Sequence, residues 1–161
     1  MSCDEKSMSL AESFLKRAFN KQWEAQEHIK MSRYAESISS SQECIELSVK
    51  AIFLLFHGEH PRKHEFSEEE FENVLRKIPN EYYKSHEYFC GHVDLCKVYL
   101  YSKFWSQFYT VAKYGYERLG VGADKLFGRE EAELALRHAM TCYTCASNLF
   151  NWIKQRAAAQ A

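Results

Sequence analysis

Turn-forming residues are scarce in this chain, and their scarcity limits the fold more than any other feature. The 161 residues include only two prolines and six glycines, too few for the many closely spaced turns of a β-sandwich or barrel. Between them, apolar residues recur three and four positions apart, as on one face of a helix. The pattern predicts an all-α fold, an antiparallel up-and-down bundle of four long helices plus one short helix.

Length and composition indicate one domain. A hydrophobic content of 46% is too high for a disordered chain, and this length suffices for a core without disulfides. We expect a disordered N-terminus over residues 1–6, a helical bundle over 7–156 and a frayed tail over 157–161. Ser67 and Glu70 have the capping-box spacing that opens the short helix, and Ser85 is expected to cap the third long helix.

Charge and hydropathy restrict the partners and the location. The formal net charge of -1 gives no general attraction to nucleic acid, although a local basic patch is compatible with it. No apolar run reaches the roughly 18 residues of a membrane span, and the N-terminal residues lack the apolar core of a signal peptide. Six cysteines without an export signal are expected to be reduced thiols. We therefore expect a cytoplasmic protein with no membrane partner.

A polar stripe follows one face of the second predicted helix. Gln42, Glu46 and Lys50 stand four residues apart, so they stack over about 12 Å of that helix. One interpretation is an ordinary solvated Glu46–Lys50 pair, worth about 0.3–0.5 kcal/mol. The other places the stripe in a groove or at a dimer seam, where Lys50 binds a nucleotide phosphate.

The loop after this helix is rich in histidine and basic residues. His57, His60 and His64, with Arg62 and Lys63, could together hold an anion. Alternatively, His64 pins the following helix through a hydrogen bond from its ring to a backbone carbonyl.

These two segments resemble the HEPN family of small helical domains. That family's second helix ends in a Gln-x-x-x-Glu-x-x-x-Lys-Ala-type run, followed by a glycine and a His-acidic-apolar element. The matching residues here are Gln42, Glu46, Lys50-Ala51, Gly58 and His64-Glu65-Phe66, with a weaker match at Tyr116-Glu117-Arg118. The resemblance implies a helical bundle whose ligand-binding residues are Gln42, Glu46, Lys50 and His64, with Arg118 as a weaker addition.

Many members of that family are metal-independent ribonucleases that carry an arginine and a histidine four to six residues apart. No arginine in this sequence is followed by a histidine at that spacing. The resemblance therefore implies a non-catalytic nucleotide- or RNA-binding or interaction domain without a cofactor, working with a separately encoded minimal nucleotidyltransferase. Enzymatic activity stays open, because a degenerate, toxin-like ribonuclease could pair Arg62 or Arg118 with His64.

The cysteines give a third hypothesis, a metal- or thiol-binding protein. Cys142 and Cys145 have CxxC spacing, and His86/Cys90 and His92/Cys96 are pairs four residues apart. Neighbouring helices could bring four such ligands to one zinc ion. We favour core packing instead and predict no metal, because buried cysteine behaves as a small hydrophobe.

The third long helix is predicted to be apolar on more than one side. A three-four spacing marks one face, formed by Phe89, Val93, Cys96, Leu100, Phe104, Phe108 and Val111. Further aromatic residues fall on other faces, among them Tyr99, Tyr101, Trp105, Tyr109, Tyr114 and Tyr116. Such a helix must be buried on several sides, so we predict a homodimer. The alternative is a base-stacking surface, for which Lys97, Lys103 and Lys113 are the available cations.

Overall fold

The computed structural model describes residues 4–61 and 66–160, and within these ranges it contains helices and no β-strand. The long elements are α1 (Glu5–Lys30), α2 (Tyr34–His57), α5 (His92–Ser106) and α8 (Arg129–Gln160). The short ones are α3 (Glu68–Leu75), α4 (Asn80–Ser85), α6 (Tyr109–Tyr114), the 3-10 turn η1 (Glu117–Leu119) and α7 (Ala123–Leu126). The prediction of an all-α bundle is confirmed.

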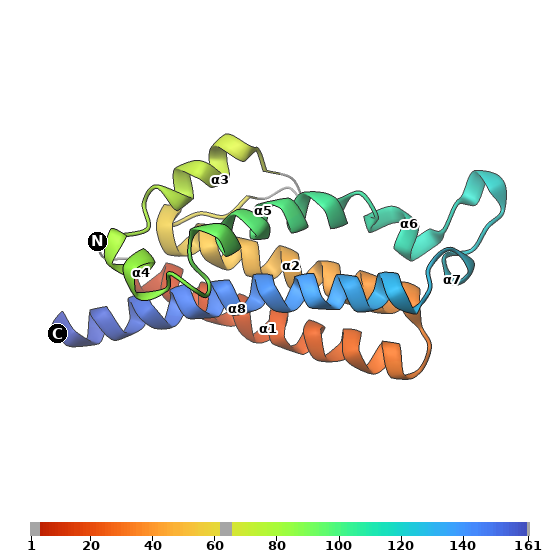
Figure 1. Cartoon of the computed structure of the whole chain (residues 1–161), viewed down its shortest axis with the longest axis horizontal. Helices are drawn as coiled ribbons and strands as arrows, with labels where there is room; N and C mark the ends of the chain where they lie inside the picture. The colour runs from red at the N-terminus through yellow and green to blue at the C-terminus, as the bar shows by residue number, and fades with distance from the viewer. Residues whose placement is uncertain (1–3, 62–65, 161) are drawn as a thin grey trace.

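The central helix of the bundle is α2. It packs against α1, α8, α5 and α6, and most of its residues are buried. In Figure 1, α1 and α2 run in opposite directions, α8 lies along them, and α5 continues into α6 on the other side of α2. Because α2 is enclosed on several sides, polar residues on it face other helices and not open water.

Local sequence explains where the helices begin and end. The Asp4 carboxylate accepts a hydrogen bond from the Ser7 amide at 2.8 Å and caps α1. The helix therefore includes Glu5 and Lys6, which the sequence predicts to be part of a disordered N-terminus. Gly58 ends α2 with a left-handed φ of 74°. The last helix, α8, continues through the alanines at 157–159, because alanine has the highest helix propensity.

The third long helix differs from the prediction. The capping box of Ser67 and Glu70 is present on α3, but Ser85 ends α4 and caps nothing, since its hydroxyl donates to the Tyr82 carbonyl. A tight connection follows, in which a Cβ on Gly91 would lie 2.4 Å from the His86 carbonyl oxygen. The predicted helix is therefore divided into α4, α5 and α6.

The apolar face of α5 is also rotated from the predicted one. Its buried residues are Leu95, Val98 and Trp105. Four residues of the predicted three-four face are exposed by 49–69%; we call these four, Phe89 just before the helix and Val93, Leu100 and Phe104 on it, the α5 stripe. One side of α5 packs on α2 and α8. Because α5 has apolar residues on its other side as well, that second apolar face is not covered by the described part of the chain. Among the described helices, none combines the length and apolar composition needed to cross a membrane.

Candidate functional site

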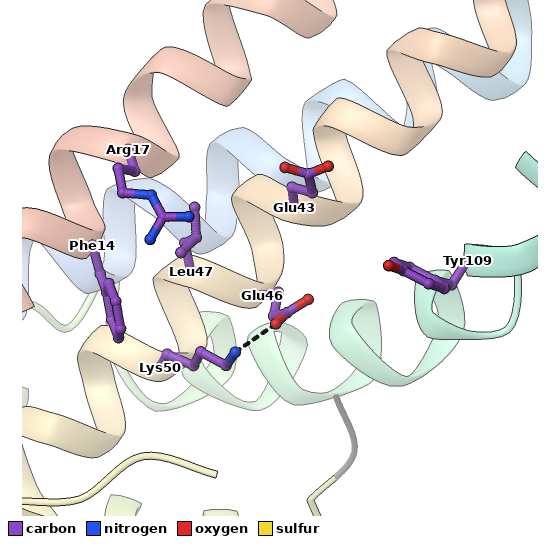
Figure 2. A pocket seen from close by; sticks show the side chains of 7 residues that line it. All are labelled: Phe14, Arg17, Glu43, Glu46, Leu47, Lys50 and Tyr109. Atoms are coloured by element: carbon purple, nitrogen blue, oxygen red, sulfur yellow. Dashed lines mark hydrogen bonds and ion pairs between the residues drawn. The ribbon is translucent and has the colours of Figure 1, made fainter. Parts of the chain in front are cut away.

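The polar stripe of α2 opens into a pocket bounded by α1 and α6. This α1–α2 pocket has a volume of about 270 Å³ and is lined by Phe14, Arg17, Glu43, Glu46, Leu47, Lys50 and Tyr109. Figure 2 shows Phe14 and Arg17 projecting from α1, with Lys50 and Glu46 on α2 and Tyr109 reaching in from α6. Three helices that are distant in the sequence therefore contribute to one concave surface.

Lys50 and Glu46 form an ion pair inside this pocket. The Lys50 Nζ and Glu46 Oε1 atoms are 2.6 Å apart, and the two side chains are only 17% and 23% exposed. The pair is thus more sheltered than the ordinary solvated pair that was one of the two interpretations of this stripe. Lys50 keeps two further N–H donors that can serve an incoming anion.

Arg17 adds a second cation that the sequence analysis missed. Its guanidinium carbon lies 6.0 Å from the centre of the Phe14 ring. Among the described residues, no carboxylate lies within ion-pair distance of Arg17. A planar guanidinium with free N–H groups suits the bidentate binding of phosphate or carboxylate. No sequence signal marks Arg17, because its place beside Lys50 depends on how α1 packs against α2.

A second hollow adjoins the pocket and shares Glu46 and Tyr109 with it. This α2–α5 recess has a volume of about 230 Å³ and is also lined by Gln42, Ile45, Ser102, Ser106 and Thr110. Gln42 is 8% exposed, and its amide oxygen has no hydrogen-bond partner among the described residues. A buried acceptor left unpaired costs about 1–3 kcal/mol. Gln42 is therefore suited to accept a hydrogen bond from a bound molecule.

Further cations stand at the edge of the pocket. Lys21 Nζ lies 3.4 Å from Glu43 Oε2 and 2.7 Å from a Glu24 oxygen. Lys113 donates to the Tyr109 hydroxyl at 3.0 Å, and this hydrogen bond raises the pKa of Lys113. The lining includes two cations, Arg17 and Lys50, and two carboxylates, Glu43 and Glu46, so the site suits a ligand that carries both an anion and hydrogen-bond donors.

The structure brings together three of the five predicted ligand residues. Gln42, Glu46 and Lys50 line the adjoining hollows. Arg118 lies in the exposed η1 turn and lines neither hollow. His64 lies outside the described residues, as do Arg62 and Lys63.

The zinc hypothesis finds no support in the described ranges, where no three His, Cys, Asp or Glu side chains group as metal ligands. The two imidazoles that it invoked stack on tyrosines instead: His86 lies 4.1 Å from the Tyr82 ring centre and His92 lies 3.5 Å from that of Tyr83. Cys96 is exposed and Cys142 is buried.

Comparison with known proteins agrees with this architecture. The family model described as HEPN domain matches residues 11–156. The solved structure of TT1696 from Thermus thermophilus is similar with a TM-score of 0.60 and 18% identity, over 86% of this chain and 97% of that chain. At that identity the similarity concerns the fold alone. No curated protein matches the chain.

Proposed function

This chain belongs to the HEPN domain family, and on that premise we propose that it is a non-catalytic domain that binds a nucleotide, free or at an RNA end, in the α1–α2 pocket. The observation that carries the proposal is the position of Arg17. Its guanidinium has no carboxylate partner among the described residues and shares a concave pocket with the half-buried Lys50.

Each lining group has a role in this proposal. The Arg17 guanidinium and the Lys50 ammonium bind the phosphate oxygens through charge-assisted hydrogen bonds. Phe14 and Tyr109 offer apolar faces for a base or sugar. The Gln42 amide oxygen accepts from a donor group of the ligand that reaches the α2–α5 recess. The two hollows together fall in the range of about 300–1,000 Å³ typical of ligand sites.

The lining residues favour binding over hydrolysis. The family's arginine–histidine spacing is missing from the sequence, and neither hollow is lined by a described histidine. General acid–base catalysis of phosphodiester cleavage needs a group that titrates near neutral pH, most often histidine. We therefore assign Glu46 to holding and orienting Lys50.

A thermal-shift titration with ATP tests the proposal. Ligand at about a hundred times its dissociation constant stabilises the folded state by about 2.7 kcal/mol, which raises the Tm by roughly 5–11 °C for a chain of this size. Arg17→Ala and Lys50→Ala should each weaken binding about tenfold or more. Arg76→Ala is the matched control, because Arg76 is an exposed cation just after the end of α3, where it pairs with Glu72.

No ATP-induced shift, or a shift that survives both pocket substitutions, would refute nucleotide binding at this site. The same preparation should be incubated with RNA. Degradation of RNA by the wild type, lost in His64→Ala, would replace the binding proposal by the ribonuclease alternative.

We also propose that the domain is a homodimer joined through the α5 stripe. Four large apolar side chains are 49–69% exposed: Val93, Leu100 and Phe104 on α5, and Phe89 in the connection that leads into it. Met140 on α8 is 45% exposed and borders the same hollow as Phe89. Apolar surface of this extent is typical of an interface.

Light scattering decides the oligomeric state. We expect twice the chain mass for the wild type and the mass of one chain for Leu100→Glu. Leu119→Glu should stay dimeric, because Leu119 is equally apolar and 73% exposed but lies in η1. A monomeric wild type, or a dimer that persists in Leu100→Glu, would contradict this interface.

The protein partner that we propose is a minimal nucleotidyltransferase in the cytoplasm. One support is family membership. The other is that the described part of the chain is helical and has no strand to carry the carboxylates of a transferase, so the transferase chemistry would come from a separate protein. Mixing the two purified proteins and measuring the mass of the complex tests this proposal, and two separate species would count against it.

A further inference from the structure

Two cysteines from distant parts of the sequence meet at a pocket that the proposed nucleotide site does not use. Cys90 lies in the connection between α4 and α5, and Cys145 lies on α8. Both line a hollow of about 510 Å³, and Asn148, one turn after Cys145 on α8, donates to the Cys90 sulfur at 3.2 Å. We infer that Cys90 and Cys145 are a redox-active dithiol that a hydroperoxide converts into a disulfide.

The backbone of Cys90 is held in an unusual conformation. Its φ is 57°, in the left-handed region that residues with a side chain rarely adopt. Its amide donates to Asp94 Oδ2 at 2.8 Å, and its carbonyl accepts from the Tyr82 hydroxyl at 3.0 Å. Backbone strain of this kind is typical of functional positions. Here it fixes the Cys90 sulfur against α8.

The two sulfurs have different surroundings, which favour the thiolate at Cys90 and the thiol at Cys145. The hydrogen bond with Cys145 lowers the pKa of Cys90, and the Asn148 amide, which donates to Cys90 Sγ at 3.2 Å, lowers it further; burial and the Asp94 carboxylate oppose both. The shared hydrogen bond and burial raise the pKa of Cys145. Because the Asn148 N–H points at the Cys90 sulfur and stabilises its thiolate, we assign Cys90 as the nucleophile and Cys145 as the thiol that resolves the intermediate.

The other buried cysteines lack these features. Burial raises the pKa of Cys44 to about 12 and that of Cys142 well above its usual value. Neither residue lines this hollow. The CxxC spacing of Cys142 and Cys145 is therefore misleading, since the thiol that meets Cys145 comes from the α4–α5 connection.

The proposed reaction balances with a hydroperoxide as the oxidant. The Cys90 thiolate attacks the nearer oxygen of H₂O₂, the O–O bond breaks, and Cys90 becomes a sulfenic acid while the released hydroxide takes up a proton. The Cys145 sulfur then attacks the Cys90 sulfur, forming the S–S bond and expelling hydroxide, which leaves as water with the Cys145 proton. Two thiols and one peroxide give one disulfide and two waters.

The test uses the full chain carrying Cys3→Ser and Cys96→Ser, so that the exposed Cys96 and the cysteine outside the described residues do not react. After brief treatment with equimolar H₂O₂, non-reducing peptide mapping should show one Cys90–Cys145 crosslink. Cys145→Ala should instead accumulate a sulfenic acid at Cys90 that dimedone traps, and Cys90→Ala should give neither product. Cys142→Ala is the matched control and should still form the crosslink.

The rate supplies a second measurement. Asn148→Leu keeps a similar shape without the N–H donor and should slow oxidation roughly fivefold, the equivalent of one hydrogen bond. Phe89 lines this hollow and also belongs to the α5 stripe. Because a dimer joined through that stripe would change access to the hollow, the rate is measured at low and high protein concentration. A crosslink through Cys142 or Cys44, or thiols that stay reduced in dilute protein, would overturn the inference. Nucleotide binding is not needed for any of these results.

Discussion

Replacing Gln42 by methionine should make the protein more stable and less able to bind. The Gln42 side chain is almost fully buried in α2, and its amide oxygen has no partner among the described residues. An unpaired buried acceptor costs about 1–3 kcal/mol, whereas methionine has a similar length, a similar helix propensity and no strong polar group that needs a partner. The amide oxygen is buried without a partner, whereas the amide nitrogen is not among the buried unpaired atoms. Only the cost of the oxygen is therefore removed, and the free energy of unfolding should rise by about 1–2 kcal/mol.

Urea unfolding and a thermal scan measure the stability, and an ATP titration on the same samples measures the binding. The expected gain corresponds to a Tm increase of roughly 2–8 °C, together with a reduced ATP-induced shift. Ser41→Ala is the matched control. The Ser41 hydroxyl is also buried without a partner among the described residues, but it lines neither hollow. Its removal should leave the ATP response unchanged.

Two results would refute this reasoning. If Gln42→Met lowers the free energy of unfolding by about 1 kcal/mol or more, the amide makes a structural hydrogen bond in the folded protein. If the variant is more stable but keeps the full ATP-induced Tm shift, the Gln42 amide oxygen is unpaired in the folded protein but does not contact the ligand.

Three further predictions concern the fold. Trp105 donates to Nδ1 of His138 at 3.0 Å, and burial, followed by the Arg137 charge, lowers the pKa of His138 below 6.5. Below pH 6.5 the unfolded chain therefore binds a proton more readily than the folded chain does. Urea unfolding should show a free energy of unfolding that is highest above pH 6.5 and decreases as the pH falls below that value. In His138→Gln this pH dependence should be weaker. Ser67→Ala removes the hydroxyl that caps α3 and should lower the Tm by roughly 2–4 °C in a thermal scan, and an unchanged Tm would contradict a stabilising cap. Phe71→Ala empties a fully buried position and should reduce the free energy of unfolding in urea by about 3–5 kcal/mol, whereas a loss below about 1 kcal/mol would mean that α3 is not part of the core.

Sequence patterns predicted the features that depend on close neighbours along the chain. The capping box of Ser67 and Glu70 and the glycine stop at Gly58 were found where the sequence placed them. Both involve residues within one helical turn, so their geometry follows from local backbone rules. The sequence did not predict the α4–α5 connection, because serine is a residue type that often caps helices and Ser85 is the cap that the pattern predicts. In the structure α5 begins after Gly91, where a side chain would not fit, and Asp94 accepts a hydrogen bond from the Cys90 amide before the first turn.

The α5 stripe shows a second limit of sequence patterns. Phe89, Val93, Leu100 and Phe104 have the spacing of a core face, yet they are exposed, while Leu95 and Val98 are buried. Periodicity identifies an apolar face, but it does not distinguish the face that meets α2 from a face left for another molecule. Where an element is apolar on two sides, only the packing of its neighbours decides between them.

Helical periodicity is enough to predict an all-α bundle and to place Gln42, Glu46 and Lys50 on one face of α2, because it relates residues a few positions apart. The packing of the helices was needed to show that Arg17 and Tyr109 complete that face as a pocket, and that Cys90 and Cys145 line one hollow. These are contacts between helices far apart in the chain. They depend on how the buried faces pack together, which no local pattern encodes.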